Sequence, residues 1–168
     1  MIENFEDFNQ LMDVKVIFPD QSEQTFPRGV TVSEAVGSWK KEALAAAVAA
    51  DVNGVSVDLS FALSGDAKVE PIYISSKKGI SILRHSVSHV MAQAVQEVFQ
   101  GAKVTIGPSI EDGFYYDFEY AEPFTLDDLE KIEKKMKEIV AADHPFVREE
   151  LPREKAVDLF AAKGEDYK

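Results

Sequence analysis

The chain has 168 residues, of which 45% are hydrophobic and 29% charged, the balance of a soluble protein with one ordinary domain or two small ones. Its formal net charge of −12 argues against a general nucleic-acid coat, because phosphate binding relies on lysine and arginine. The chain has no cysteine, and no apolar run approaches the roughly 20 residues that cross a bilayer. We therefore expect a cytoplasmic protein without disulfides and without membrane contact.

The first half of the chain has the pattern of a small β-rich domain. Residues 14–18 alternate apolar and polar side chains, as a half-buried strand does, and residues 22–26 return as the second arm of a hairpin. Thr31 and Glu34 then have the spacing of a capping box, which predicts a short helix that turns Val32, Ala35, Val36 and Trp39 inward.

The alanine-rich residues 43–52 are ambiguous, because their composition favours a helix. They run into Asn53-Gly54, the strongest two-residue hairpin signal, so we interpret residues 48–59 as strand, hairpin and strand. A last strand follows over residues 69–74, and residues 75–79 are polar enough for a linker. This order predicts an α+β, β-grasp (ubiquitin-like) domain over residues 1–76, with its core at about 12–75, and a second domain over residues 77–168.

The second domain is predicted to mix helices with short strands. We expect helices over residues 79–100, 125–142 and 153–162, and strands over 103–106, 113–119 and 146–150. Thr125 and Asp128 supply a second capping box. The helix that they begin is expected to bury one stripe of side chains: Leu126, Leu129, Ile132, Met136, Ile139 and Val140.

The helix over residues 79–100 carries the most suggestive polar residues. Its apolar stripe is expected at Leu83, Val87, Val90, Met91, Ala94 and Val98. At 100° per residue, His85 and His89 lie nearly opposite this stripe and one turn apart, so they can act jointly on a ligand. A histidine pair at this spacing is more often a solvated helix face than an active site, and both readings stay open at this point.

The histidines do not predict a metal site. The HExxH zinc motif needs a glutamate directly after the first histidine, where this chain has Ser86. A zinc ion also needs a third protein ligand, and His144 is the one remaining histidine. We expect no metal. The aromatic run over residues 114–120 is likewise open to two readings, since β-sheet packing explains its density and a pocket wall is the alternative.

Four segments together resemble a known family. They are RHSVSHVMAQAVQEVF (84–99), KVTIGPSIEDGFYYDF (103–118), FTLDDLEKIEKKMKEIV (124–140) and AVDLFAAKGEDYK (156–168). In this order they resemble the editing domain of bacterial threonyl-tRNA synthetases, and residues 12–75 resemble the small TGS domain that precedes it. The combination of HxxxH, IGPxIxxGFYYD and GExYK at these intervals is far more specific than any one motif.

The resemblance implies a function and a set of site residues. Family members join threonine to its tRNA with ATP and hydrolyse tRNA(Thr) that carries serine by mistake. By motif match, His85, His89 and Lys168 would be catalytic and Tyr116 would bind substrate. The partners implied are the acceptor end of tRNA(Thr) and the rest of a synthetase chain, in a homodimeric parent.

The resemblance also implies that this chain is incomplete as an enzyme. The family's editing site draws on a later Cys-xxx-His segment, and ATP, magnesium and zinc serve an aminoacylation core; we expect all of these beyond residue 168. The fragment alone is then expected to be inactive. Two alternatives remain: a non-catalytic module that binds RNA or protein, and a free-standing aminoacyl-tRNA deacylase.

Overall fold

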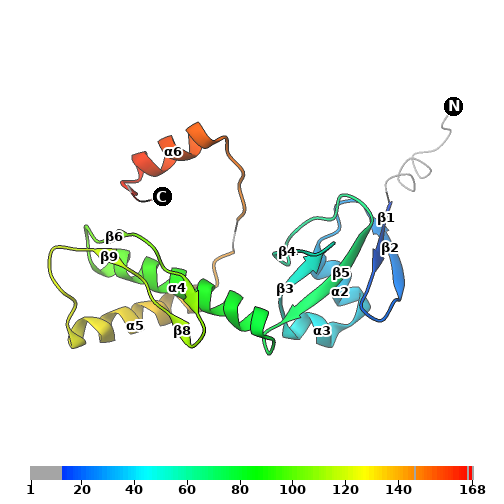
Figure 1. Cartoon of the computed structure of the whole chain (residues 1–168), viewed down its shortest axis with the longest axis horizontal. Helices are drawn as coiled ribbons and strands as arrows, with labels where there is room; N and C mark the ends of the chain where they lie inside the picture. Colours follow the sequence, from blue (N-terminus) through cyan, green and yellow to red (C-terminus); the bar gives the residue numbers. More distant parts are fainter. Residues whose placement is uncertain (1–12, 146, 166, 168) are drawn as a thin grey trace. The chain divides into compact units, whose positions relative to one another are not determined.

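The computed structural model of the chain describes residues 13–145, 147–165 and 167. They form two compact units that meet between Leu83 and Arg84, within one long helix (Figure 1). None of the helices in this described part of the chain has the length and hydropathy of a membrane span. The domain boundary expected between residues 76 and 77 stays a prediction.

The first unit is built on a five-stranded mixed sheet. Its strands are β1 (Asp13–Ile17), β2 (Glu23–Pro27), β3 (Ala47–Val52), β4 (Val55–Val57) and β5 (Ala67–Tyr73). Their order across the sheet is β2-β1-β5-β3-β4, with β1 and β5 parallel and the other neighbours antiparallel. The two outer hairpins and the central parallel pair confirm the predicted β-grasp, α+β fold.

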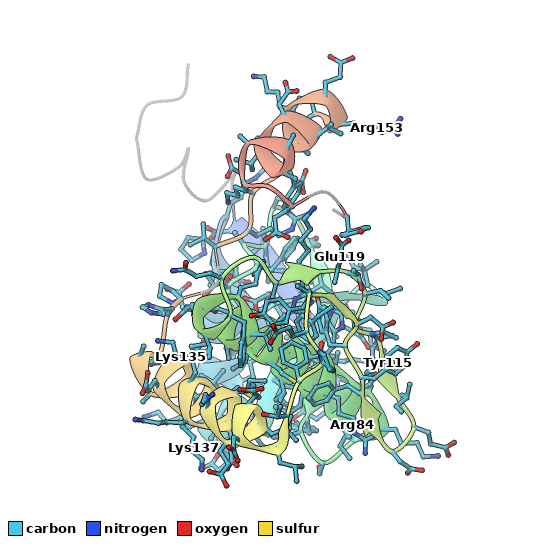
Figure 2. The ribbon with its side chains drawn as sticks, turned by 90° about the vertical axis from the view of Figure 1, so that its left-hand side faces the viewer. Arg84, Tyr115, Glu119, Lys135, Lys137 and Arg153 are labelled. Carbon is cyan, nitrogen blue, oxygen red and sulfur yellow. The ribbon has the colours of Figure 1, made fainter. Side chains whose placement is uncertain are left out.

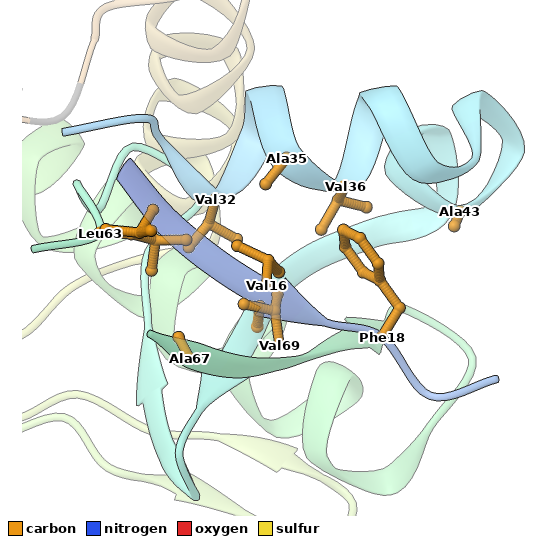
Figure 3. Close-up of a cluster of buried hydrophobic side chains, with 11 residues drawn as sticks. Val16, Phe18, Val32, Ala35, Val36, Ala43, Leu63, Ala67 and Val69 are labelled. Carbon is orange, nitrogen blue, oxygen red and sulfur yellow. The ribbon is translucent and has the colours of Figure 1, made fainter. Parts of the chain in front are cut away.

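One face of this sheet is covered by α2 (Val32–Trp39), and the first core lies between them (Figure 3). The alternation along β1 buries Val14, Val16 and Phe18. The predicted capping box begins α2, with Thr31 and Glu34 each bonding the other's backbone N–H. Trp39 stacks on Phe18, with ring centroids 5.0 Å apart, so its predicted inward position is confirmed.

The alanine-rich patch divides between two elements. A short helix that was not predicted, α3 (Lys41–Ala46), is followed directly by β3. Residues 47–52 become a strand because β5 and β4 pair with them on either side, which overrides the helical preference of alanine. Asn53 and Gly54 both have positive φ, at 52° and 84°, as the predicted hairpin turn requires.

The predicted linker over residues 75–79 is wrong, because the next helix, α4, already begins there (Lys77–Val98). Ser76 caps its first turn, since its Oγ accepts a hydrogen bond from the Gly79 N–H at 3.0 Å. Gly79 permits close packing: a Cβ at this position would lie 2.0 Å from the Tyr73 carbonyl oxygen. Lys78 also pairs with Asp51, with Nζ 2.7 Å from Oδ1, so α4 is joined firmly to the first unit at its start.

The second unit packs the rest of α4 against α5 (Leu126–Ala142). Its core is small: Ala94, Val95, Ala102 and Ile132 are buried, and Met91, Phe99, Phe118, Phe124, Met136 and Ile139 pack against them. The capping box of Thr125 and Asp128 is confirmed. Hydrogen bonds from Lys131 and then Thr125 lower the pKa of the Asp128 carboxyl to about 2.

The buried stripe predicted for α5 is wrong at three positions. Leu126, Leu129 and Val140 are 81%, 54% and 66% exposed, whereas Ile132 is buried. The core that packs against α5 is narrow. It covers only the part of the predicted stripe that lies around Ile132.

The strands predicted over residues 103–106 and 113–119 are interrupted. The structure has four strands of two residues each, β6 (Lys103–Val104), β7 (Ser109–Ile110), β8 (Gly113–Phe114) and β9 (Phe118–Glu119). β6 pairs with β9, and β7 with β8. Pro108 offers no N–H to a ladder, which fits the break between β6 and β7.

The last helix of the described chain is α6 (Arg153–Ala162), as predicted. The strand predicted over residues 146–150 is wrong where it can be compared, because residues 147–150 have no regular structure. These residues are exposed, and the exposed stretch offers no partner strand to fix an extended conformation. Phe146 lies outside the described residues.

Candidate functional site

The two predicted histidines meet on the surface of α4. Their ring centroids are 4.6 Å apart, nearly perpendicular, and the two Nε2 atoms lie 3.1 Å apart. One Nε2 must donate and the other accept in such a contact, so the pair holds a single proton between its facing nitrogens. Both side chains are exposed, so water and a ligand can reach them.

Tyr116 lies next to this pair, and its assignment as a substrate-binding residue stays a prediction. Its ring centroid is 6.3 Å from that of His89, edge to face, and it stacks on Phe118 at 5.2 Å. The ring also lies against Gly107, where a Cβ would be 2.0 Å from Tyr116 Cδ2. The glycine of the IGP motif therefore provides the space that the tyrosine ring occupies.

Ser88 fixes the distance between the histidine helix and the connection from β6 to β7, which carries Gly107. Its side chain is fully buried, and its Oγ lies 2.7 Å from the carbonyl oxygen of His85 and 3.2 Å from that of Gly107. The hydroxyl proton is shared between these two acceptors. A serine within a helix signals nothing by itself, so this role of Ser88 could not be predicted from the sequence.

Arg84 makes a second connection between α4 and the β7–β8 hairpin (Figure 2). Its Nη1 donates to the carbonyl oxygen of Ile110 at 3.2 Å and contacts that of Glu111. The turn that precedes the aromatic run is thereby held against the helix beside His85. This contact could not be predicted from the sequence, because Arg84 and its two partners are far apart along the chain.

The buried face of α4 differs from the predicted stripe. Ser88, Ala92, Ala94 and Val95 are buried, and Leu83 is 41% exposed. The buried sector is thus rotated toward Ser88, because the segment with Gly107 covers one flank of the helix and α5 another. His85 and His89 remain at the exposed edge of this sector.

The aromatic run contributes to packing, as one of its two interpretations predicts, and its use as a pocket wall stays a prediction. Phe118 belongs to the second core, where it packs edge to face on Phe124. Tyr116 borders the histidines, and Tyr115 is 48% exposed (Figure 2).

One predicted residue cannot be placed at the site. Lys168 lies outside the described residues, so its catalytic assignment stays a prediction. Among residues 13–145, 147–165 and 167, no three His, Asp or Glu side chains are placed to hold a metal ion. The described residues thus do not fit a zinc ion, which takes three or four protein ligands.

Comparison with known proteins bears on both units. Residues 14–72 match the model of the TGS domain family, within the β-grasp unit described above. This segment is a TGS domain. The expected TGS core over residues 12–75 differs from the match by only a few residues at each end.

The similarity continues beyond the TGS domain into the histidine unit. The chain is 50% identical over 155 residues to a threonine–tRNA ligase of Rhizobium etli (strain CIAT 652), which covers 92% of this chain and 23% of that protein. It is 46% identical to the threonine–tRNA ligase of Symbiobacterium thermophilum, with 92% of this chain and 24% of that protein covered. The protein of the same name from Aromatoleum aromaticum is 46% identical over 91% of this chain and 24% of its own length.

These relatives confirm the predicted resemblance to threonyl-tRNA synthetases. The chain corresponds in sequence to a TGS-containing region of threonine–tRNA ligase, and it spans about a quarter of the length of the curated relatives it matches.

Proposed function

We propose that this chain supplies the TGS domain and part of an editing site to a threonine–tRNA ligase, which attaches threonine to tRNA(Thr) with ATP and hydrolyses tRNA(Thr) mischarged with serine. The observation that carries the proposal is the contact of His85 and His89 at 3.1 Å, with Tyr116 beside it. This histidine pair lies within a chain that is 50% identical over 155 residues to a threonine–tRNA ligase of Rhizobium etli.

The proposal also includes the binding partners, the cellular compartment and the cofactors of the ligase. The partners are the acceptor end of tRNA(Thr) and the remaining segments of the ligase, which works in the cytoplasm as a homodimer. In this proposal, ATP, magnesium and zinc serve the aminoacylation reaction and take no part in the histidine site.

The proposed reaction is the hydrolysis of an ester. A water oxygen attacks the carbonyl carbon of serine, and an imidazole takes the proton that the water loses. The bond from this carbon to the ribose oxygen then breaks, the ribose oxygen receives a proton, and serine and uncharged tRNA leave. An imidazole with an ordinary pKa near 6.5 can perform both proton transfers at neutral pH.

In the proposal, the residues of the site divide these tasks. His85 and His89 position the water and the terminal ribose, and their shared proton allows one ring to accept while the other donates. Tyr116 forms a wall beside them, and Lys168 stabilises charge on the ester oxygens. Serine and threonine differ by one methyl group. A difference in binding energy alone would discriminate between them by only about 1–3 kcal/mol, so the site would reject threonine by steric exclusion.

The test uses the protein at the length that its source cells produce. An antibody against residues 80–168 first shows whether the mass of the native protein exceeds 18.7 kDa, the mass of the 168 residues. We then expect His85→Ala with His89→Ala to slow the release of labelled serine from seryl-tRNA(Thr) by about 100-fold or more, with aminoacylation unchanged. His144→Ala is the matched control, because it removes the third histidine, which lies just after α5, and should leave the release rate as it was.

The outcomes separate the competing functions. Unchanged serine release in the double variant would end the assignment of the two histidines. A native protein of 18.7 kDa that releases serine would be a free-standing deacylase. A protein of that size without release would be a binding module.

A further inference from the structure

The C-terminal helix is held differently from α4 and α5. No side chain of α6 is buried, and none belongs to the second core, among the residues that the structure describes. Since α6 has so little apolar burial, its placement in the unit depends on polar contacts. The structure shows such contacts in the segment that follows it.

This segment, of which residues 163–165 and 167 are described, turns back sharply after α6 at Gly164. Gly164 has a φ of +70°, the left-handed conformation that commonly ends a helix. The N–H of Gly164 bonds the Ala161 carbonyl at 3.0 Å, and that of Glu165 bonds the Phe160 carbonyl at 2.9 Å. The turn is therefore well fixed, and it sets the direction in which the Glu165 side chain leaves the helix.

Two side chains of the segment reach other elements. The Glu165 Oε1 accepts a hydrogen bond from Gln96 Nε2 of α4 at 2.6 Å, and both side chains are half-buried. The Tyr167 hydroxyl contacts a carboxylate oxygen of Glu119 on β9, which Figure 2 labels. Bonds between a neutral donor and a carboxylate are stronger than those between two neutral groups.

Gln96 lies on the same face of α4 as the histidines. It follows His89 by seven residues, which is two turns and about 20° of rotation at 100° per residue. The contact with Glu165 therefore brings the C-terminal segment to the histidine face, about 10 Å along the helix from His89.

We infer that Gln96 and Glu165 are positioning residues that hold residues 163–165 and 167 against the histidine face of α4, as one wall of the site that receives the aminoacyl ester. The inference rests on the proposed function for the nature of the site. It assigns Gln96 and Glu165 no contact with substrate: they act through the segment that they hold.

The test exchanges the two partners. Gln96→Glu places two carboxylates together, so we expect serine release to fall about tenfold in single turnover and hydrogen exchange of residues 160–167 to accelerate. Glu165→Gln combined with Gln96→Glu restores one amide and one carboxylate in the reverse order, and both readouts should return to within about twofold of the natural protein. A general effect on folding would not show this recovery.

The same helix offers a matched control. Gln93 donates to Glu97 at 2.8 Å, an exposed pair of the same residue types one helical turn apart. Gln93→Glu introduces the same charge on α4 but faces no C-terminal segment, so release and exchange should stay unchanged.

The two proposals fail in distinguishable ways. If the natural protein released no serine, the proposed function would fall, and hydrogen exchange alone would decide whether the two residues hold the segment. Exchange rates of residues 160–167 that are equal in the natural protein and in Gln96→Glu would overturn the positioning contact. So would a double exchange that restores neither readout.

Discussion

Replacement of Gly107 by alanine tests whether the tyrosine beside the histidines occupies space that only glycine leaves. An alanine Cβ would lie 2.0, 2.3 and 2.6 Å from three ring atoms of Tyr116. Carbon atoms pack at about 3.5–4.0 Å, so the ring would have to move by roughly 1.5 Å. That movement disturbs its stack on Phe118 and its contact with the edge of His89.

The expected loss of stability follows from two opposing effects. Overpacking of this kind costs about 1–3 kcal/mol, and the reduced freedom of the unfolded chain returns about 0.4–1 kcal/mol. The net destabilisation is then about 1–2 kcal/mol. For a unit of this size, each kcal/mol corresponds to a fall in Tm of about 4–8 °C, so we expect a decrease of roughly 5–15 °C.

Thermal and urea unfolding of the whole chain, followed by circular dichroism, measures this difference. Gly113→Ala is the control, because a Cβ there meets nothing within 4 Å, and it should cost little or nothing. In a Tyr116→Ala background, Gly107→Ala should cost less than about 0.5 kcal/mol, since the ring that it displaces is absent. Equal costs for the two glycines, or an unchanged cost of Gly107→Ala without the ring, would refute the reasoning.

Three further predictions concern the two units. Gly79→Ala should destabilise the first unit by about 1–2 kcal/mol, as measured by urea unfolding, because the new Cβ would lie 2.0 Å from the Tyr73 carbonyl oxygen. This clash outweighs the roughly 1 kcal/mol that alanine gains over glycine in helix propensity. A stabilised variant would show that the backbone moves to accept the Cβ. Asp128→Asn should unfold more easily than the natural chain above about pH 4, and the difference should vanish as the pH falls toward 2, because a lowered pKa stabilises the folded state only while the carboxyl is ionised; a difference that persists at pH 2 contradicts this. Ile132→Ala should cost about 2–4 kcal/mol, whereas Leu126→Ala, at an 81% exposed position on the same helix, should change stability by less than about 0.5 kcal/mol; similar losses would mean that Leu126 is covered.

Features that depend on near neighbours in the chain could be predicted from the sequence. The capping boxes at Thr31 and Thr125 and the turn at Asn53-Gly54 form between residues no more than four positions apart. Alternation along β1 predicted its buried face, because one sheet face meets one core. The histidine pair needed only the helical repeat to be expected on one face.

Tertiary structure decided the features that join distant segments. Gly79 reads as a break in the sequence, but its missing side chain lets the first turn of α4 approach β5. The buried face of α4 is set by whatever covers it, so the predicted stripe was displaced toward Ser88. Composition favoured a helix at residues 47–52. The Asn53-Gly54 turn signal nevertheless predicted a strand there, and pairing with β4 and β5 fixes that strand.

The candidate site shows the same division. The sequence by itself determined that two imidazoles share a helix face and that a TGS-like domain precedes them, because helical spacing and ordered motifs are local properties. Only the tertiary structure decided that Gly107 faces Tyr116 and that Gln96 binds Glu165, 69 positions away. Helical periodicity states where a side chain points, but not which distant segment it meets, since that depends on how all the elements pack at once.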